Sequence, residues 1–428
     1  MPRTQRSFTL STLALAVLAA SGQVYAATAT VPVSCKLIGA DRLFDGNEVQ
    51  FNKSVLVVGD KVKAVGDFAS LSGQCATRYN LGDATIMPGF IESHAHVTFQ
   101  NVSKDKILEH GITTVQDTGG PLLPPQGGNG SLRLLSTGPI LQAQGGYPLN
   151  VFTPDDTGGG YDKVGLAIAA NATESQVRAV VQNLAAGGAS AIKIALETGG
   201  EAGAPWMMSH GHGEVPAAPW PILSQQQVAW IVSEAHNQGK RVLAHVGENR
   251  GFEIAYAAGV DMLAHMPCAA VDANLLHSAV HDGMEFTSTI DTLASCGDGL
   301  YQNAHVVGHV YQEHAGEGLA FPLVYGSEIA HDNVPWGING EELHLMLHLG
   351  SGDAIDFGDV LNVLRSATSA AAARLATGIP GLGTLSANAP ADLIAVKGNA
   401  LERFKLLEYP DMVMSGGKLV VNKFSPTR

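Results

Sequence analysis

The stretch Met87-Pro88-Gly89-Phe90-Ile91-Glu92-Ser93-His94-Ala95-His96 decides how the rest of this sequence is interpreted. It ends an apolar run that predicts a β-strand over residues 85–91. Side chains at positions i and i+2 of an extended segment point to the same side, so the imidazoles of His94 and His96 project together beyond the strand. Neutral imidazole is a good ligand for zinc and related divalent metals. The motif therefore indicates part of a metal site.

Strand-like and helical patterns alternate through the middle of the chain. Eight apolar segments predict strands at 85–91, 112–116, 140–143, 191–195, 241–246, 262–265, 285–290 and 323–326. Helices are expected between them, for example at 174–186, 225–238 and 359–375. This alternation predicts an α/β fold with a (β/α)₈ TIM-type barrel. An open doubly wound sheet is the alternative, but no G-x-G-x-x-G motif follows a first strand, which disfavours dinucleotide binding.

Both ends of the chain carry short strand patterns separated by Gly, Asp and Asn. They lie at 36–39, 55–58, 63–65 and 78–81, and again at 392–396 and 418–421. Such spacing is typical of a small antiparallel β unit. We expect residues 27–84 and 383–428 to form one composite β-sandwich domain, with the barrel spanning residues 85–382.

The first 26 residues resemble a secretory signal peptide. Arg3 and Arg6 precede an apolar stretch at 10–20 that is too short for a stable membrane span, and cleavage is expected after Ala26. An uncleaved membrane anchor is the alternative. The predicted location is periplasmic or secreted, with no membrane association after cleavage.

The net charge excludes one class of partner. The formal charge of −14 becomes about −16 when Arg3 and Arg6 are removed, and no basic stripe is present. This balance disfavours nucleic acid and anionic membranes as partners. A small-molecule substrate is expected, and a homo-oligomer is possible.

Four cysteines remain in the expected mature chain, and in an exported protein they can form disulfides. Four cysteines allow three pairings. We favour Cys35–Cys75 and Cys268–Cys296, because each pair lies within one predicted domain. The absence of C-x-x-C spacing argues against a structural zinc site.

Further polar residues follow or lie within the predicted barrel strands. Lys193 lies in the fourth strand, His245 and His265 end the fifth and sixth, and Glu328 follows the eighth. In a (β/α)₈ barrel the chemistry takes place at the carboxyl ends of the strands. These side chains are therefore expected to converge with His94 and His96.

The sequence resembles the amidohydrolase superfamily, in the branch of imidazolonepropionase-like enzymes and Xaa-Pro-type dipeptidases. Beside the stretch that ends in His96, the matching segments are Gly111-Ile112-Thr113-Thr114-Val115, Ile192-Lys193-Ile194, Thr198-Gly199-Gly200, Ala244-His245, Ala258-Gly259-Val260-Asp261, His265, Gly383-Thr384-Leu385 and Ala391-Asp392-Leu393-Ile394. They cover nearly the whole expected mature chain in the family's order.

The resemblance implies two divalent metal ions, expected to be Zn²⁺. The implied ligands are His94, His96, Lys193, His245, His265 and Glu328, with Lys193 carboxylated by CO₂ so that its carbamate bridges the metals. Buried lysine loses its proton readily, which suits carbamate formation. The sequence departs from the family at the eighth strand, where Gly326-Ser327-Glu328 replaces the usual Gly-Thr/Ser-Asp. Glu328 is the expected catalytic base, and Asp332 is the alternative.

The resemblance further implies a binuclear hydrolase that cleaves an amide bond of a dipeptide or N-acyl amino acid by metal-activated hydroxide. Candidate substrate-binding residues are Tyr147, His210, His212 and Arg250. One alternative is a lactonase, phosphotriesterase or other cyclic-amide hydrolase on the same scaffold. The other is a non-catalytic binding protein that lost the aspartate of the eighth strand.

Overall fold

The computed structural model describes residues 34–427, except 153–160, 209–213, 332–333 and 353. The predicted signal peptide and the candidates His210, His212 and Asp332 lie outside the described residues. Among the helices that are described, none is both long enough and apolar enough to cross a membrane. Both favoured disulfides, Cys35–Cys75 and Cys268–Cys296, are present.

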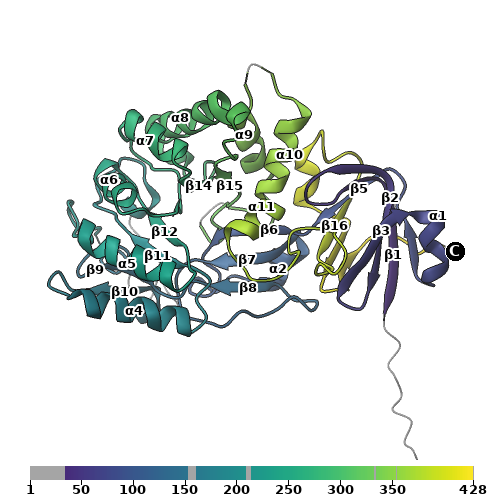
Figure 1. The fold of residues 1–428 in the computed structure, drawn as a ribbon, viewed down its shortest axis with the longest axis horizontal. Helices are drawn as coiled ribbons and strands as arrows, with labels where there is room; N and C mark the ends of the chain where they lie inside the picture. Colours follow the sequence, from purple (N-terminus) through teal and green to yellow (C-terminus); the bar gives the residue numbers. More distant parts are fainter. Residues whose placement is uncertain (1–33, 153–160, 209–213, 332–333, 353, 428) are drawn as a thin grey trace, which may run out of the picture. The chain divides into compact units, whose positions relative to one another are not determined.

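The two ends of the described chain contribute strands to one sheet, as the sequence predicts, and this sheet is mixed (Figure 1). Its strands are β1 (Cys35–Phe44), β2 (Val49–Val58), β3 (Lys61–Asp67), β4 (Arg78–Asn80), β5 (Ala84–Pro88), β16 (Leu393–Lys397), β17 (Met412–Ser415) and β18 (Lys418–Asn422). The order is β18-β17-β16-β5-β1-β2-β3, with β4 beside β1. The expectation of a purely antiparallel unit was wrong, because β1 pairs in parallel with both β4 and β5. Alternation of apolar residues does not encode strand direction.

The eight predicted barrel strands are all present in two parallel sheets, the first two strands in one sheet and the other six in the other. They are β6 (Phe90–Ala95), β7 (Ile112–Asp117), β9 (Ile140–Ala143), β11 (Ile192–Ala195), β12 (Val242–His245), β13 (Met262–Leu263), β14 (Glu285–Thr287) and β15 (Leu323–Val324). Two further strands escaped sequence analysis: β8 (Arg133–Ser136) pairs with β7, and β10 (Gly165–Ile168) pairs with β9. The last strand meets the first through two hydrogen bonds, from the Ser93 N–H to the Tyr325 carbonyl (3.3 Å) and from the His96 N–H to the Ile329 carbonyl (2.9 Å).

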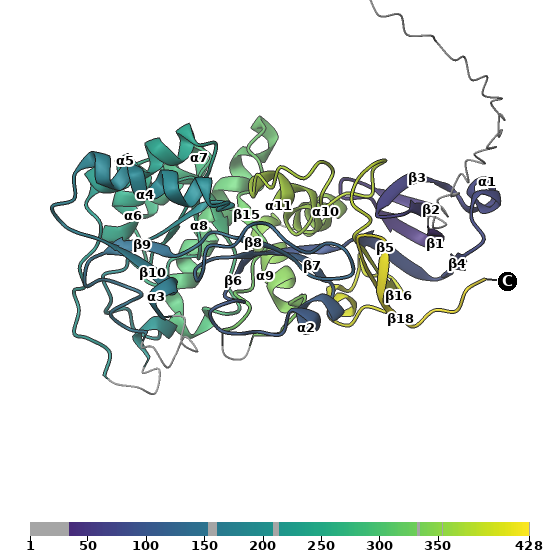
Figure 2. The same ribbon diagram turned by 90° about the horizontal axis from the view of Figure 1, so that it is seen from below.

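Helices lie along the outside of the parallel strands (Figure 2). The described helices are α1 (Phe68–Leu71), α2 (Lys104–Glu109), α3 (Tyr161–Val164), α4 (Glu174–Ala186), α5 (Gln225–Asn237), α6 (Asn249–Ala257), α7 (Ala273–His281), α8 (Asp298–His314), α9 (Gly340–Gly350), α10 (Phe357–Ser366) and α11 (Ser369–Arg374). The bounds of α4 and α5 agree with the sequence expectation to within one residue. Thr173 and Ser224 begin these two helices with capping boxes, which satisfy backbone N–H groups of the first turn.

The predicted helix at 359–375 is instead two helices. Thr368 separates α10 from α11, with non-helical angles of φ −136° and ψ −103°. Its hydroxyl donates a hydrogen bond to the Leu364 carbonyl at 2.7 Å, so the side chain competes with the helical backbone. The apolar periodicity of the segment does not reveal this interruption.

The predicted first strand at 85–91 is likewise divided, and the division joins the terminal sheet to the barrel. Residues up to Pro88 belong to β5 of the terminal sheet, and β6 of the barrel begins at Phe90. Gly89 lies between them, where an added Cβ would be 2.2 Å from Cγ2 of Thr113 on β7. Only glycine fits this close approach without a shift of the neighbouring strand.

Replacement of Gly89 by alanine is expected to destabilise the fold. Overpacking against Thr113 predicts a loss of about 1–3 kcal/mol in the free energy of unfolding, measured by chemical denaturation. Gly316→Ala is the matched control, because no atom lies within 4 Å of the added Cβ there. Equal stabilities for Gly89→Ala and Gly316→Ala would contradict the packing argument.

Candidate metal centre

Four of the predicted histidines come together at the carboxyl ends of three barrel strands. His94 lies in β6 and His96 follows it, His245 ends β12, and His265 follows β13 by two residues. The ring centroids of His94 and His265 are 4.3 Å apart, those of His94 and His96 are 5.1 Å apart, and those of His245 and His265 are 4.9 Å apart. The convergence expected from the strand ends is present in the structure.

Glu328 reaches the same centre from the end of the eighth barrel strand. Its Oε1 lies 3.5 Å from Nε2 of His96, and its Oε2 lies 3.6 Å from Nδ1 of His265. The backbone of Glu328 has φ +56°, a left-handed conformation that is uncommon for a residue with a side chain. Such conformations persist where the surroundings impose them, often at functional sites. The carboxylate of Glu328 thus lies within 3.6 Å of both His96 and His265, where an acid after the eighth strand is expected.

Lys193 is buried in β11, next to the strand that carries His245. It is paired in register with Leu243 of β12, and it is only 1 % exposed. Burial lowers the pKa of Lys193 to about 7, although the nearby charge of Glu328 opposes this shift. A substantial share of the amine is thus uncharged near neutral pH, which is the form that reacts with CO₂.

Burial keeps three histidines of this centre, His94, His245 and His265, uncharged. Burial lowers the pKa values of His94 and His265 well below the usual range and that of His245 to about 3. Burial acts in the opposite sense on Glu328, but His265 and His96 outweigh it and lower the pKa of that carboxyl. Neutral imidazoles around an ionised carboxylate are the ligand forms that bind a divalent metal.

Several buried polar atoms of the centre lack hydrogen-bond partners among the described residues. They are both ring nitrogens of His94, Nδ1 of His96, Nδ1 of His265 and Oε2 of Glu328. An unpaired buried polar atom is costly, and native structures contain few of them. Ligand atoms of His94, His265 and Glu328 all lie within 4.8 Å of one another. The donor set and its unpaired atoms fit a divalent metal ion.

Glu92 fixes the first barrel strand to the eighth beneath this centre. Its carboxylate accepts hydrogen bonds from the His94 N–H (2.9 Å), the Ser327 N–H (3.0 Å) and the Ser327 hydroxyl (2.7 Å). Glu92 is fully buried, and desolvation raises its pKa to about 8. Glu92 stands in the motif that precedes His94, but the sequence alone indicates no role for it. Its charge inside an apolar strand, two residues before His94, was the available signal.

Glu197 and Glu201 support the fifth-strand histidine, and sequence analysis missed both of them. Oε2 of Glu197 lies 3.1 Å from Nε2 of His245, and Trp206 Nε1–H donates to Glu201 at 3.2 Å. Burial raises the pKa values of both carboxyls to about 7. A carboxylate on one ring nitrogen orients histidine and leaves the other nitrogen for a metal. The feature of the sequence that could have revealed Glu197 is its position four residues after Lys193, at the start of the loop that contains Gly199 and Gly200.

Aromatic rings line one side of the histidines. Tyr147, a predicted substrate-binding residue, lies with its ring centroid 4.7 Å from that of His245 and stacks on Trp220 at 6.1 Å. Trp206 also packs on His245 at 4.6 Å, and Phe99 packs on His96 at 4.9 Å. Burial and the charges of Glu328 and Glu197 raise the pKa of Tyr147 well above its usual value, so its hydroxyl stays protonated.

Arg250 is not brought to the centre. It lies in the first turn of α6, its side chain is 66 % exposed, and its guanidinium lies 3.5 Å from Glu253 on the same helix. The exposed helix position explains this difference, since the sequence shows only that Arg250 follows the fifth strand.

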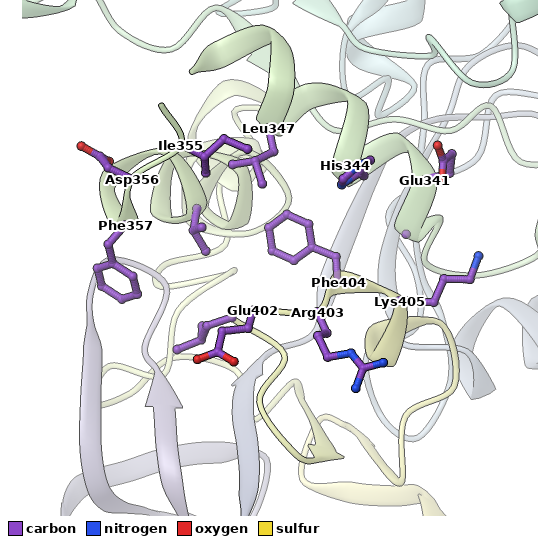
Figure 3. A pocket seen from close by; sticks show the side chains of 13 residues that line it. Glu341, His344, Leu347, Ile355, Asp356, Phe357, Glu402, Arg403, Phe404 and Lys405 are labelled. Carbon is purple, nitrogen blue, oxygen red and sulfur yellow. The ribbon is translucent and has the colours of Figure 1, made fainter. Parts of the chain in front are cut away.

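A pocket of about 710 Å³ lies elsewhere, between α9, α10 and the 3₁₀ segment η5 (Phe404–Glu408). In Figure 3, Leu347 of α9 and Phe404 of η5 point toward each other across it. None of its lining residues belongs to the histidine centre.

Comparison with known proteins gives a single family. Residues 85–420 match the model described as the amidohydrolase family. Ochratoxinase of Aspergillus niger is 26 % identical over 309 residues, which span 70 % of this chain and 58 % of that protein. The match thus covers less than two thirds of this curated relative.

Solved structures share the fold. The structure of A. niger ochratoxinase superposes with a TM-score of 0.67 at 20 % identity, over 92 % of this chain and 96 % of that chain. A Xaa-Pro dipeptidase with bound methionine gives a TM-score of 0.63 at 22 % identity, over 90 % and 99 % of the two chains. A prolidase complexed with N-methylphosphonate-L-proline gives 0.67 at 21 % identity, over 91 % and 100 %.

Ser327→Ala is expected to loosen the centre without removing a ligand. The variant loses the hydroxyl hydrogen bond to Glu92, which predicts a loss of about 1 kcal/mol in stability. Metal affinity should fall about 10-fold, because supporting partners orient ligands. Ser70→Ala, at an exposed hydroxyl that bonds the Asp67 carbonyl, is the control. Unchanged metal affinity in Ser327→Ala would show that the contact between Glu92 and Ser327 does not position Glu328.

Proposed function

This chain belongs to the amidohydrolase family, and from that premise we propose that it is an exported binuclear metalloenzyme that hydrolyses the amide C–N bond of a dipeptide or N-acyl amino acid. The observation that carries the proposal is the convergence of four imidazoles, one carboxylate and one buried amine at the barrel strands. The two disulfides support a periplasmic or secreted location.

His94, His96, His245, His265 and Glu328 would hold two divalent metal ions, expected to be Zn²⁺. When bound, the ions polarise the amide carbonyl and lower the pKa of water. Lys193 would complete the centre as a carbamate: its neutral amine forms an N–C bond to CO₂ and releases a proton. Its burial beside the strand of His245 supports this role.

Two carboxyls, those of Glu328 and Glu197, would transfer the proton and orient a ligand. Glu328 would take the proton of the attacking water and pass it to the leaving nitrogen, because its carboxylate is ionised and lies between His96 and His265. Glu197 would hold the His245 ring in one orientation through Nε2. Asp332 stays the alternative base.

The aromatic wall supports a substrate with an apolar group next to the amide. Tyr147, Trp206 and Trp220 would contact that group, since planar rings bury large apolar area with defined geometry. The structures of a Xaa-Pro dipeptidase with methionine and of a prolidase with a phosphonate-proline ligand support the substrate class. His210 and His212 stay predictions for the same pocket.

A substrate panel tests the proposal directly. We expect hydrolysis of dipeptides and N-acyl amino acids with apolar acyl groups, and rates at least 10-fold lower for lactones and phosphotriesters. A strong chelator and His94→Ala should each reduce the rate more than 100-fold, because each removes metal from the centre. Hydrolysis that survives both treatments would refute the metal-dependent scheme. A preference for lactones or phosphotriesters would favour the alternative of a lactonase or phosphotriesterase on the same scaffold.

Glu328→Asp separates an enzyme from a binding protein. If Glu328 is the base, shortening it withdraws the carboxylate from His96 and His265, and kcat should fall at least 10-fold while two metal ions are retained. Elemental analysis and steady-state kinetics of both forms provide the measurement. An unmodified protein that is inactive and gains activity through Glu328→Asp would instead favour a binding protein that has lost its base.

A further inference from the structure

Helices α7 and α8 pack against each other on the outside of the molecule (Figure 1), and they carry a second group of side chains of types that bind metals. His277 of α7 and Glu313 and His314 of α8 each offer a ligand atom, and the three atoms lie within 4.8 Å of one another. Nε2 of His277 and Oε2 of Glu313 are 3.9 Å apart. We propose that these residues form a surface site for a divalent transition metal, distinct from the buried centre.

The ligand spacing is close to what such an ion needs. Ligands held at 2.0–2.2 Å in a tetrahedral arrangement lie about 3.3–3.6 Å apart, so small side-chain rotations suffice. Two imidazoles and one carboxylate match the ligands of zinc and nickel, whereas calcium and magnesium prefer oxygen alone. The set crosses between two helices, so helical periodicity alone does not explain it.

Neighbouring side chains already orient two of the ligands. Nδ1 of His314 lies 2.9 Å from the Glu317 carboxylate, which leaves Nε2 of that ring for a metal. Oε1 of Glu313 lies 3.5 Å from Nε2 of His309, while its Oε2 faces His277. A carboxylate on the far nitrogen of a ligating histidine is the usual support of a metal site.

His281 is a candidate fourth ligand. The ring centroid of His281 lies 5.2 Å from that of His314, and its Nδ1 lies 3.6 Å from Asp282, so Nε2 of His281 can turn toward the ion. Water can also complete the coordination, since the site is half-exposed. The acids Glu313, Glu317 and Asp282 make the patch favourable for a cation. A bound ion would cross-link α7 to α8.

Counting bound zinc tests the proposal. The full-length protein and the double variant His277→Ala/His314→Ala are dialysed to equilibrium against the same free Zn²⁺ concentration, and zinc per chain is measured by elemental analysis. We expect the double variant to bind one equivalent fewer at saturation, with the remaining sites unchanged. Hydrolytic activity should not change, since these residues lie outside the buried centre.

Two controls make the result specific. His305→Ala removes an exposed imidazole from the same helix, at a position outside the ligand set, and should leave the zinc count as in the unmodified protein. Equal thermal unfolding of all variants in metal-free buffer verifies that the fold is intact. His94→Ala lowers the zinc count through the buried centre, so its effect should add to that of the double variant.

An equal zinc count in the double variant and the unmodified protein would overturn the proposed surface site, whatever the outcome for the buried centre.

Discussion

The structure depends on a set of polar groups that are buried without protein partners. His94, His265 and Glu328 leave ring nitrogens and a carboxylate oxygen without hydrogen bonds among the described residues, at the centre of a barrel. Removing such groups from water costs free energy that packing alone does not recover. Divalent metal ions bound at this point would offset that cost by coordinating these nitrogens and oxygens. The amidohydrolase fold thus concentrates at one point the groups that a metal requires.

The surroundings of the centre hold its ligands at fixed positions. Glu92 joins the ends of the first and eighth strands through His94 and Ser327, and the next residue, Glu328, adopts a left-handed backbone. Glu197 occupies the outer nitrogen of His245. At the amino-terminal end of the first barrel strand, the terminal sheet continues into the barrel through Gly89. The supporting carboxyls Glu92 and Glu197 have raised pKa values because they are buried.

Strand ends were predictable from the sequence, and contacts between loops were not. The common location of His94, His96, Lys193, His245 and His265 follows from the ends of apolar segments in a barrel, whereas their role as metal ligands is what the resemblance to the amidohydrolase superfamily implies. Glu92 and Glu197 were missed because their partners, Ser327 and His245, are distant in sequence. Arg250 was misplaced because a residue after a strand can enter either the site or the next helix. The break at Thr368 depends on a side-chain hydrogen bond that apolar periodicity does not encode.

X-ray absorption and anomalous diffraction on the purified protein test the central claim most directly. The account predicts two divalent ions about 3.5–4 Å apart, surrounded by the nitrogens of His94, His96, His245 and His265, with added density on Nζ of Lys193. A metal-saturated protein with no ion among these side chains would contradict it.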